Sequence, residues 1–365
     1  MMKIQVLADD RTGNTHQAIA LAEKFTEEYT IIKLQYNCLA KLPNFLLKYY
    51  PMHIKSELLQ DILDKSPPDM IITAGRRTAV LAFYLKKKFK DIKLIQIMQP
   101  NLPYNAFDTV ILPYHDYHLS SRDLIAGSNK NLKRHCEATK WLRQSQDFFT
   151  RLLRQYFVFP RNNDFKNIIP INGAINNVTA KFASTSLELQ KHYPNLKQFI
   201  AVIIGGNNKK FNFNKDEAVL FSSLLNKIYT NLKIPFFISF SRRTPQAVKS
   251  IIKNNMPAST IIYDPNEDTG YNPYIAMLSK AKYIISTADS ISMCSEAASS
   301  GKPLYIFCPP NFNSSKHKIF IKQLVKQKIA RIFDETVISL EEYNYKPLNE
   351  AARVAEIIKS LIKSW

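Results

Sequence analysis

The sequence of 365 residues holds only eight glycines and four cysteines, and it lacks any long apolar run. So few glycines argue against repeat architectures, and no G-x-G-x-x-G fingerprint follows the first predicted strand, which disfavours a nicotinamide dehydrogenase. The cysteines have no paired spacing, so we expect neither a zinc site nor a disulfide framework, and no metal. No stretch approaches the roughly 18 apolar residues that span a bilayer. With a charged start rather than a signal peptide, we expect a cytoplasmic protein, soluble or peripheral on the inner face of a membrane.

Acidic residues are also scarce, since 30 Asp and Glu stand against 50 Lys and Arg, a net charge of +20. Part of this excess reflects a composition rich in Ile, Asn and Lys. The remainder favours anionic ligands or an anionic membrane surface. The basic residues are spread over many helices and no recognition motif is present, so nucleic acid is not an expected partner.

The length predicts two α/β domains, which we expect to be Rossmann-like and to face each other across an interdomain cleft. Short apolar runs that alternate with helical patterns predict strands at 3–7, 31–34, 70–73, 93–98, 109–112, 167–171, 199–204, 234–240, 261–263, 283–287 and 304–307. The expected parts are an N-terminal domain over 1–175 on the acceptor side, a crossover over 176–196, a nucleotide-side domain over 197–345 and a C-terminal helix, 346–365, that packs back toward the N-terminal domain.

One stretch carries most of the functional signal, residues 281–307. A strand at 283–287 is followed by a serine-rich loop, a helix with Ser292 as its expected N-cap, and a second strand at 304–307. Such a loop lies at the carboxyl edge of a parallel sheet, where ligands bind and where a helix N-terminus offers N–H groups to an anion. Glu296 would accept hydrogen bonds from a ribose diol while Ser290 and Ser292 hold phosphate. The alternative is an ordinary βαβ unit with a solvated glutamate.

An arginine pair occurs at a strand end in each half of the chain. Gly75-Arg76-Arg77-Thr78 follows the third predicted strand, and Ser241-Arg242-Arg243-Thr244 follows the eighth, with Thr244 as the expected N-cap and Pro245 opening the helix. Two arginines at a helix N-terminus oppose the macrodipole, and a bound phosphate or carboxylate would reverse that sign. We therefore expect an anion site at one pair or both. The alternative is that both pairs bridge the domains or cap carboxyl ends.

Other candidates lie at further strand ends. His115 with Asp116 follows the fifth strand and is a candidate acid/base unit, although neighbours on a strand face opposite ways. Asn14 and Gln17 resemble a capping box. The basic segment 129–155 predicts a solvated helix face or a membrane-surface contact. The predicted catalytic residues are His115, Asp116 and Asp10; the nucleotide or anion residues are Gly205, Gly206, Ser241, Arg242, Arg243, Thr244, Asp289, Ser290, Ser292 and Glu296; those of the acceptor side or the cleft are Arg11, Gly13, Asn14, Gln17, Gly75, Arg76, Arg77, Thr78, Asn172 and Asn272.

Taken together, the motifs resemble the mitochondrial-fission family first described in plants for elongated mitochondria, including its bacterial relatives. The matching residues run through the whole chain in order: 10–17, 75–78, 107–108 with 115–116, 172–174, 205–206, 241–245, 272–274 and 287–303. The resemblance implies a glycosyltransferase-B fold. The second half of the family's chains is similar to nucleotide-sugar enzymes in which a serine-rich loop and a helix glutamate hold the nucleotide. The resemblance therefore implies that role for Ser290, Ser292 and Glu296.

Two functions follow as hypotheses. The first is a metal-independent transferase that requires no cofactor, uses a nucleotide sugar as donor, and acts on an acceptor such as an anionic lipid. The second is a non-catalytic, membrane-associated adaptor on the same fold, acting in membrane or organelle division, because plant members of the family are linked to recruiting the fission machinery.

Overall fold

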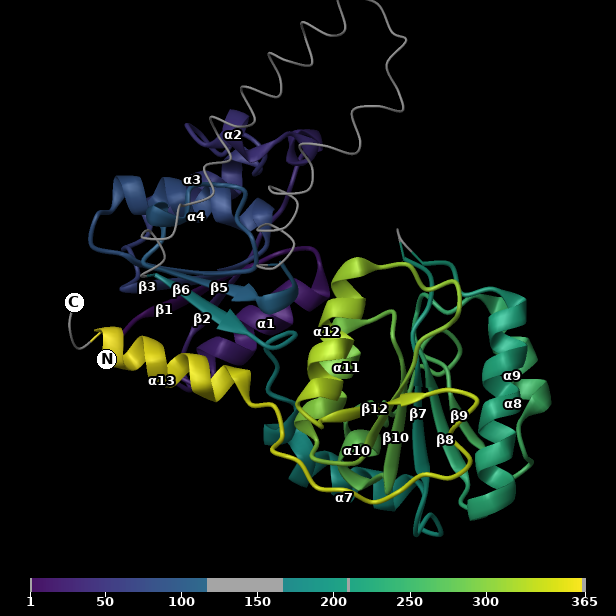
Figure 1. Cartoon of the computed structure of the whole chain (residues 1–365). Coiled ribbons are helices and arrows are strands. Elements are labelled where there is room, and N and C mark those ends of the chain that lie inside the picture. The colour runs from purple at the N-terminus through teal and green to yellow at the C-terminus, as the bar shows by residue number, and fades with distance from the viewer. Residues whose placement is uncertain (1, 117–166, 209–210, 363–365) are drawn as a thin grey trace, which may run out of the picture. The chain divides into compact units, whose positions relative to one another are not determined.

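The computed structural model describes residues 2–116, 167–208 and 211–362. The chain divides into two compact units, unit 1 (Met1–Ile171 with Glu350–Trp365) and unit 2 (Asn172–Asn349). Each unit contains a six-stranded sheet in which every strand pair is parallel (Figure 1). The α/β class with two Rossmann-like domains, predicted from the alternating pattern, is confirmed. The basic segment 129–155 lies outside the described residues.

Unit 1 has the strand order β2-β1-β3-β4-β5-β6. Every side chain of β3 and β5 is buried, as expected where helices cover both faces of a parallel sheet. The last helix, α13, contacts α1, and an apolar stripe that includes Val354 and Ile358 is buried. The elements are β1 (Ile4–Ala8), α1 (Thr12–Ala22), β2 (Thr30–Lys33), α2 (Asn44–Leu47), α3 (Ser56–Asp64), β3 (Met70–Ala74), α4 (Arg76–Lys88), β4 (Lys93–Ile97), β5 (Thr109–Pro113), β6 (Ile168–Ile171) and α13 (Glu350–Ile362).

Unit 2 has the strand order β12-β11-β10-β7-β8-β9, the Rossmann order. Its core is rich in phenylalanine; the Phe221 and Phe307 rings, for example, lie 4.6 Å apart. The elements are α7 (Phe182–His192), β7 (Ile200–Ile204), α8 (Lys215–Leu232), β8 (Phe236–Phe240), α9 (Gln246–Asn255), β9 (Ile261–Tyr263), α10 (Tyr274–Lys280), β10 (Tyr283–Thr287), α11 (Ile291–Ser299), β11 (Leu304–Phe307), α12 (Ser315–Lys326) and β12 (Ala330–Phe333).

The strand order places one ligand-binding edge in each unit. In an open parallel sheet, ligands bind beyond the carboxyl ends of the two strands at which the strand order reverses. These strands are β1 and β3 in unit 1, and β7 and β10 in unit 2. Both arginine pairs follow strands at or next to these positions, since β3 precedes Arg76 and β8, the neighbour of β7, precedes Arg242.

Three predicted helix starts are wrong. Helix α1 begins at Thr12 and has no capping box, because the Asn14 amide donates to Asp9 instead. Helix α11 has Ser290 rather than Ser292 as its N-cap. Helix α9 has Pro245 at the N-cap position, because the Thr244 hydroxyl donates to the strand-end carbonyl of Gly205.

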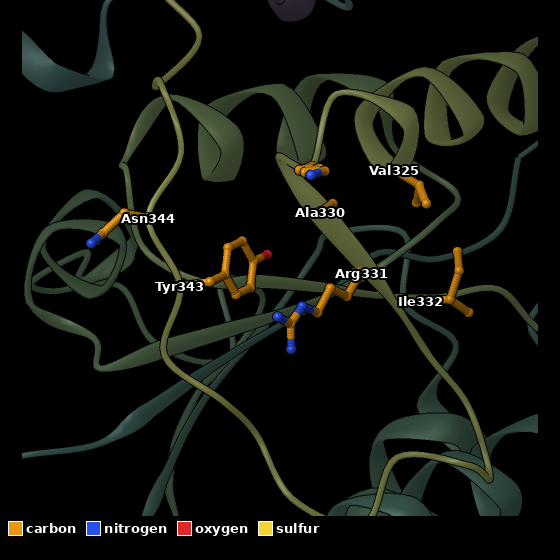
Figure 2. A pocket seen from close by; sticks show the side chains of 7 residues that line it. Val325, Ala330, Arg331, Ile332, Tyr343 and Asn344 are labelled. Atoms are coloured by element: carbon orange, nitrogen blue, oxygen red, sulfur yellow. The ribbon is translucent and has the colours of Figure 1, made fainter.

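A surface cavity of about 350 Å³ lies along β12 and the end of α12, lined by residues that include Lys328, Arg331 and Tyr343 (Figure 2). Its arginine has partners: the Arg331 guanidinium stacks over the Tyr343 ring at 4.5 Å and pairs with Glu341. Strand β12 is the edge strand, with β11 between it and β10. The cavity is therefore separate from the ligand-binding edge of unit 2. No described helix combines the length and apolar character needed to cross a membrane.

Candidate functional site

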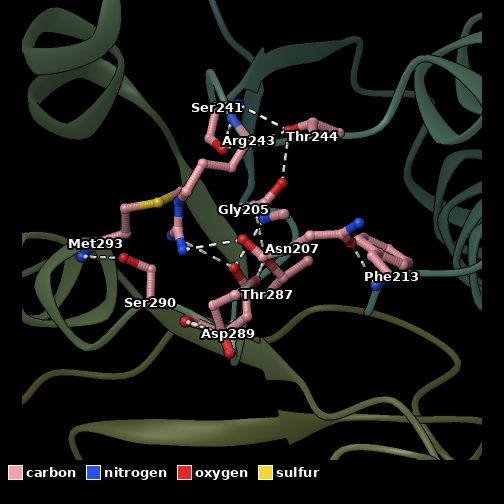
Figure 3. Close-up of polar contacts among 12 residues, drawn as sticks. Gly205, Asn207, Phe213, Ser241, Arg243, Thr244, Thr287, Asp289, Ser290 and Met293 are labelled. Atoms are coloured by element: carbon pink, nitrogen blue, oxygen red, sulfur yellow. Dashed lines mark hydrogen bonds and ion pairs between the residues drawn. The ribbon is translucent and has the colours of Figure 1, made fainter. Parts of the chain in front are cut away.

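A buried carboxylate joins the two central strand ends of unit 2. Asp289 Oδ2 accepts a hydrogen bond from the Gly206 N–H at 2.8 Å, and Oδ1 accepts one from the Thr287 hydroxyl at 2.6 Å (Figure 3). A Cβ on Gly205 would lie 2.0 Å from Asp289 Oδ2, so only glycine fits there. At Gly205 the close approach is therefore made by the protein's own carboxylate. Asp289 thus holds the site together rather than binding an anion itself.

The second arginine pair packs directly on this glycine loop. A Cβ on Gly206 would lie 2.2 Å from the Arg243 backbone, and the Ser241 N–H donates to Ile204 O at 2.9 Å. The Arg243 guanidinium donates to Asn207 O at 3.2 Å and lies 3.9 Å from Asp289 Oδ2, with 47% of its side chain exposed. Figure 3 shows this side chain reaching from the Ser241 turn toward the loop of Ser290 and Asp289. The guanidinium is therefore oriented at the strand ends while half of it faces solvent. Arg242 is exposed.

The N-terminus of α11 meets the same edge. Ser290 is the N-cap residue and its hydroxyl accepts from the Met293 N–H at 3.4 Å. Ser292 lies in the first turn and is half-buried. The first N–H groups of a helix have no intrahelical acceptor and carry a partial positive charge. Together with Arg243 they make this edge suitable for a phosphate group.

Glu296 lies in the second turn of α11 and is half-buried. Its Oε2 accepts a hydrogen bond from the Tyr274 hydroxyl at 2.6 Å. Burial raises the carboxyl pKa, although the bond from Tyr274 opposes that shift, and burial beside Glu296 raises the pKa of the Tyr274 hydroxyl well above 10. Tyr274 is therefore a stable donor. No hydrogen bond to Glu296 Oε1 is present among the residues that the structure describes, which leaves one oxygen for a ligand.

Sequence reasoning missed His317, on the first turn of α12. Its Nδ1 lies 2.6 Å from the Ser314 hydroxyl, and its ring is close enough to Asp289 and Arg243 for both to influence its pKa, which burial lowers. The signal in the sequence was a further strand end at this edge, since Ser314 and His317 follow β11 as Ser290 follows β10.

The first arginine pair has a different environment. Arg77 binds both Asp10 carboxylate oxygens, donates to Asp9 at 2.8 Å, and stacks over the Tyr36 ring at 4.6 Å. Arg76 donates to the carbonyls of Leu42 and Ala40 at 2.9 and 3.0 Å. Both guanidinium groups therefore have internal partners, and the pair stabilises unit 1.

The remaining predicted residues do not form one group. Gly75 has a φ of 90°, and a Cβ there would lie 2.5 Å from the Asn14 amide, so these two belong to the β1–β3 edge. His115 is buried at the end of β5, and β4 separates β5 from β3. Asn172 and Asn272, predicted for the acceptor side or the cleft, lie in unit 2. The other candidates for the acceptor side or the cleft are Arg11, Gly13 and Gln17 on or beside α1, and Thr78 after β3. Asp116, a predicted catalytic residue, follows β5.

Charge at the β1–β3 edge is balanced by the same contacts. Burial raises the pKa of Asp9. Burial also acts to raise the pKa of Asp10, but the hydrogen bonds from Arg77 outweigh this effect, and the pKa of Asp10 is lowered. A carboxylate with a lowered pKa is a weak base. Within residues 2–116, 167–208 and 211–362, no cluster of three or more His, Cys, Asp or Glu side chains is arranged for a metal ion.

Comparisons with known structures bear on the fold. The superposition on the UDP-GlcNAc 2-epimerase of Methanocaldococcus jannaschii covers 98% of this chain and 100% of the epimerase chain, with a TM-score of 0.58 at 12% sequence identity. A ugt transferase from Siraitia grosvenorii, solved in complex with UDP, covers 98% of this chain and 90% of its own, with a TM-score of 0.51 at 12% identity. At these identities the likeness shows the fold alone, that of two Rossmann-like domains of the glycosyltransferase-B kind.

Comparisons of sequence show the family. The Uncharacterized protein RP120 of Rickettsia prowazekii (strain Madrid E) is 70% identical over 99% of both chains. The Mitochondrial fission protein ELM1 of Arabidopsis thaliana is 26% identical over 83% of this chain, which spans 66% of that protein. The family model described as Mitochondrial fission ELM1 matches residues 12–362. The resemblance predicted from the motifs is confirmed: the chain belongs to the Mitochondrial fission ELM1 family.

Proposed function

We propose that unit 2 binds a nucleoside diphosphate or nucleotide sugar at the carboxyl ends of β7, β8 and β10, and that the protein is glycosyltransferase-like. The observation that carries this proposal is the half-exposed guanidinium of Arg243, held beside the N-terminus of α11. A cation and helix N–H groups that have no intrahelical acceptor, at the point where the strand order reverses, suit a diphosphate. Structures of similar fold include one solved with UDP, which makes UDP the first ligand to test.

Each ligand part has an assigned group. Arg243 and the first N–H groups of α11 would bind the diphosphate, and Glu296 Oε1 would accept a ribose hydroxyl while Tyr274 holds the other oxygen. If a sugar is transferred, the leaving diphosphate gains negative charge in the transition state, and Arg243 would stabilise it without a metal ion. An acceptor hydroxyl would come from a lipid or another anionic molecule, in keeping with the net charge of +20.

A non-catalytic adaptor on the same fold is the second candidate, and unit 1 favours it. Both arginines of its pair bind internal partners, and the pKa of Asp10 is lowered. The described part of unit 1 therefore presents a weak base and two occupied cations at the β1–β3 edge, which is a poor acceptor site. An adaptor would retain nucleotide binding in unit 2 without turnover.

Thermal-shift measurements with a panel of nucleoside diphosphates and nucleotide sugars test binding. A ligand at 100 times its dissociation constant stabilises the folded state by about 2.7 kcal/mol, a shift of several degrees. We expect a shift for wild type and a smaller one for Glu296→Gln, which keeps the side-chain shape. No shift with any member would contradict the proposal. The release of nucleoside diphosphate from whichever nucleotide sugar binds is then measured over time. A transferase releases it, whereas an adaptor does not.

A further inference from the structure

Unit 1 exposes a cluster of large apolar side chains in one short segment. Ten large hydrophobic side chains are exposed among the described residues, and four of them fall within residues 46–52. These four, Leu46, Tyr49, Tyr50 and Met52, have exposed fractions of 49%, 72%, 49% and 47%, and we call them the 46–52 surface. Single exposed apolar residues are ordinary, whereas a contiguous group marks an interaction site.

The segment is firmly attached to the core, so a loose loop does not explain its exposure. The Asn44 amide donates to the carbonyls of Arg76 and Pro100, both at 2.6 Å, and the His53 ring lies 2.9 Å from Arg77 O. Leu47, between the exposed residues, is 1% exposed. Both ends of the segment are thus bound near the start of α4, and the four apolar side chains are held outward.

Aromatic rings and lysines alternate on this surface. The Lys48 ammonium lies 4.9 Å from the centre of the Tyr49 ring, and Tyr50 meets Tyr84 of α4 edge-to-face at 5.5 Å. One turn further along α4, Lys87 lies over the Phe83 ring at 4.4 Å. Helices α2 and α4 contact each other in unit 1 (Figure 1). The last turn of α4 carries Lys86, which pairs with Asp108 at 2.9 Å, and the lysines Lys87 and Lys88.

The charge of these segments has one sign. No Asp or Glu occurs in residues 29–56 or 70–90, which together carry Lys33, Lys41, Lys48, Lys55, Lys86, Lys87, Lys88 and Lys90 besides the arginine pair. An anionic partner complements this charge. Leu46 and Met52 offer nucleic acid neither a hydrogen-bonding group nor an aromatic face for base stacking, and both arginines, which would bind phosphates, bind internal groups. Tyrosine beside lysine is instead typical of a membrane interface.

We propose that the 46–52 surface, with the lysines beside it, docks unit 1 on an anionic lipid bilayer. The apolar side chains would enter the headgroup region and the lysines would pair with lipid phosphates. This inference does not depend on the nucleotide site of unit 2, so either can fail without the other. The proposal places the membrane contact on the 46–52 surface, whereas the composition of the chain did not indicate where such a contact would lie.

Sedimentation with vesicles of phosphatidylglycerol and phosphatidylcholine tests the proposal on the full chain. We expect binding to the anionic vesicles, weaker binding to phosphatidylcholine alone, and a decrease as salt rises. The double variant Tyr49→Ser/Tyr50→Ser should bind at least about tenfold more weakly, since burial of apolar side chains sets the affinity. The matched control is Leu187→Ser/Ile338→Ser, which removes two side chains of 64% and 63% exposure in unit 2 and should bind as wild type does.

A second variant reports insertion directly. Tyr49→Trp should show a blue-shifted emission with anionic vesicles and quenching by brominated lipid. Equal vesicle binding by wild type and Tyr49→Ser/Tyr50→Ser would overturn the proposal, as would the absence of binding to anionic vesicles. Binding of single-stranded RNA that needs Tyr49 and Tyr50, without vesicle binding, would assign the surface to nucleic acid instead and also overturn it.

Discussion

The guanidinium of Arg243 lies 3.9 Å from the carboxylate of Asp289, and while the carboxylate is wholly buried, about half of the Arg243 side chain is exposed. This relationship joins the loops after β7, β8 and β10 in one site. The carboxylate is already hydrogen-bonded to the Gly206 N–H and the Thr287 hydroxyl, so it orients Arg243 without enclosing it. The unburied side of the guanidinium stays available for a ligand anion.

Removing the Asp289 carboxylate should destabilise unit 2. Asp289→Ala leaves the Gly206 N–H and the Thr287 hydroxyl without their acceptor in a buried site, at a cost of about 1–3 kcal/mol for each group. Urea unfolding would measure the loss. The control is Asp334→Ala, at a carboxylate whose two hydrogen bonds, from the Thr336 N–H and hydroxyl, lie in an exposed turn. An Asp289→Ala protein as stable as wild type would contradict the conclusion that Asp289 holds the site together.

Gly206→Ala should displace the arginine turn, because the new Cβ would lie 2.2 Å from the Arg243 backbone. We expect a loss of about 1–3 kcal/mol from overpacking, together with weaker nucleotide binding. Gly13→Ala is the matched control, since nothing lies within 4 Å of a Cβ there. If Gly206→Ala and Gly13→Ala had the same stability and the same affinity for the nucleotide, the contact between the glycine loop and Arg243 would contribute nothing to either.

The buried pair of Lys249 and Asp264 should stabilise unit 2 far more than the neighbouring exposed pair. Its side chains are 2% and 1% exposed, and the Lys249 ammonium lies 2.6 Å from Asp264 Oδ2. Lys249→Ala leaves a buried carboxylate unpaired, which costs about 3–5 kcal/mol. Lys253→Ala, which breaks the exposed pair with Glu267, should cost less than about 1 kcal/mol. Chemical unfolding of the two variants would compare these two losses of unfolding free energy, and equal losses would contradict the prediction.

His317 predicts a dependence of stability on pH. Burial lowers its pKa in the folded state below its usual value of 6.5, with Arg243 acting in the same direction against the attraction of Asp289. The unfolded chain therefore binds the proton more tightly, and stability should fall as the pH decreases below 6.5. His317→Asn should lose less stability than wild type between pH 8 and pH 5.5. A wild-type slope in His317→Asn would contradict this assignment.

The sequence was sufficient for the fold because buried parallel strands such as 283–287 are continuous apolar runs, and this strand was located to the residue. Strand β12 was missed, since Arg331 is exposed in the middle of its four residues and interrupts the pattern. Sequence also located the edge of unit 2, because loops after parallel strands must meet there.

The partners of charged residues could not be predicted in the same way. The two arginine pairs read alike in sequence, yet Arg77 lies against Asp9 and Asp10, whereas Arg243 keeps a half-exposed side chain. The difference depends on which side chains neighbouring strands bring together. His317 was overlooked for the same reason, because its position near Asp289 depends on how the chain folds between β11 and α12.

The most direct test of the central claim is calorimetric titration of UDP into wild type, Arg243→Ala and Arg77→Ala. Wild type should bind UDP, and Arg243→Ala should bind about 10- to 100-fold more weakly, since a hydrogen bond to a charged group contributes about 1.5–3 kcal/mol. Arg243→Ala should lose less stability than Arg77→Ala, because Arg243 lies 3.9 Å from Asp289, which keeps its hydrogen bonds from the Gly206 N–H and the Thr287 hydroxyl. Arg77→Ala should keep the wild-type affinity but lose about 3 kcal/mol of stability, because Asp9 is left buried and unpaired. If UDP binds neither wild type nor any variant, or binds Arg243→Ala as tightly as wild type, the site is not the one described.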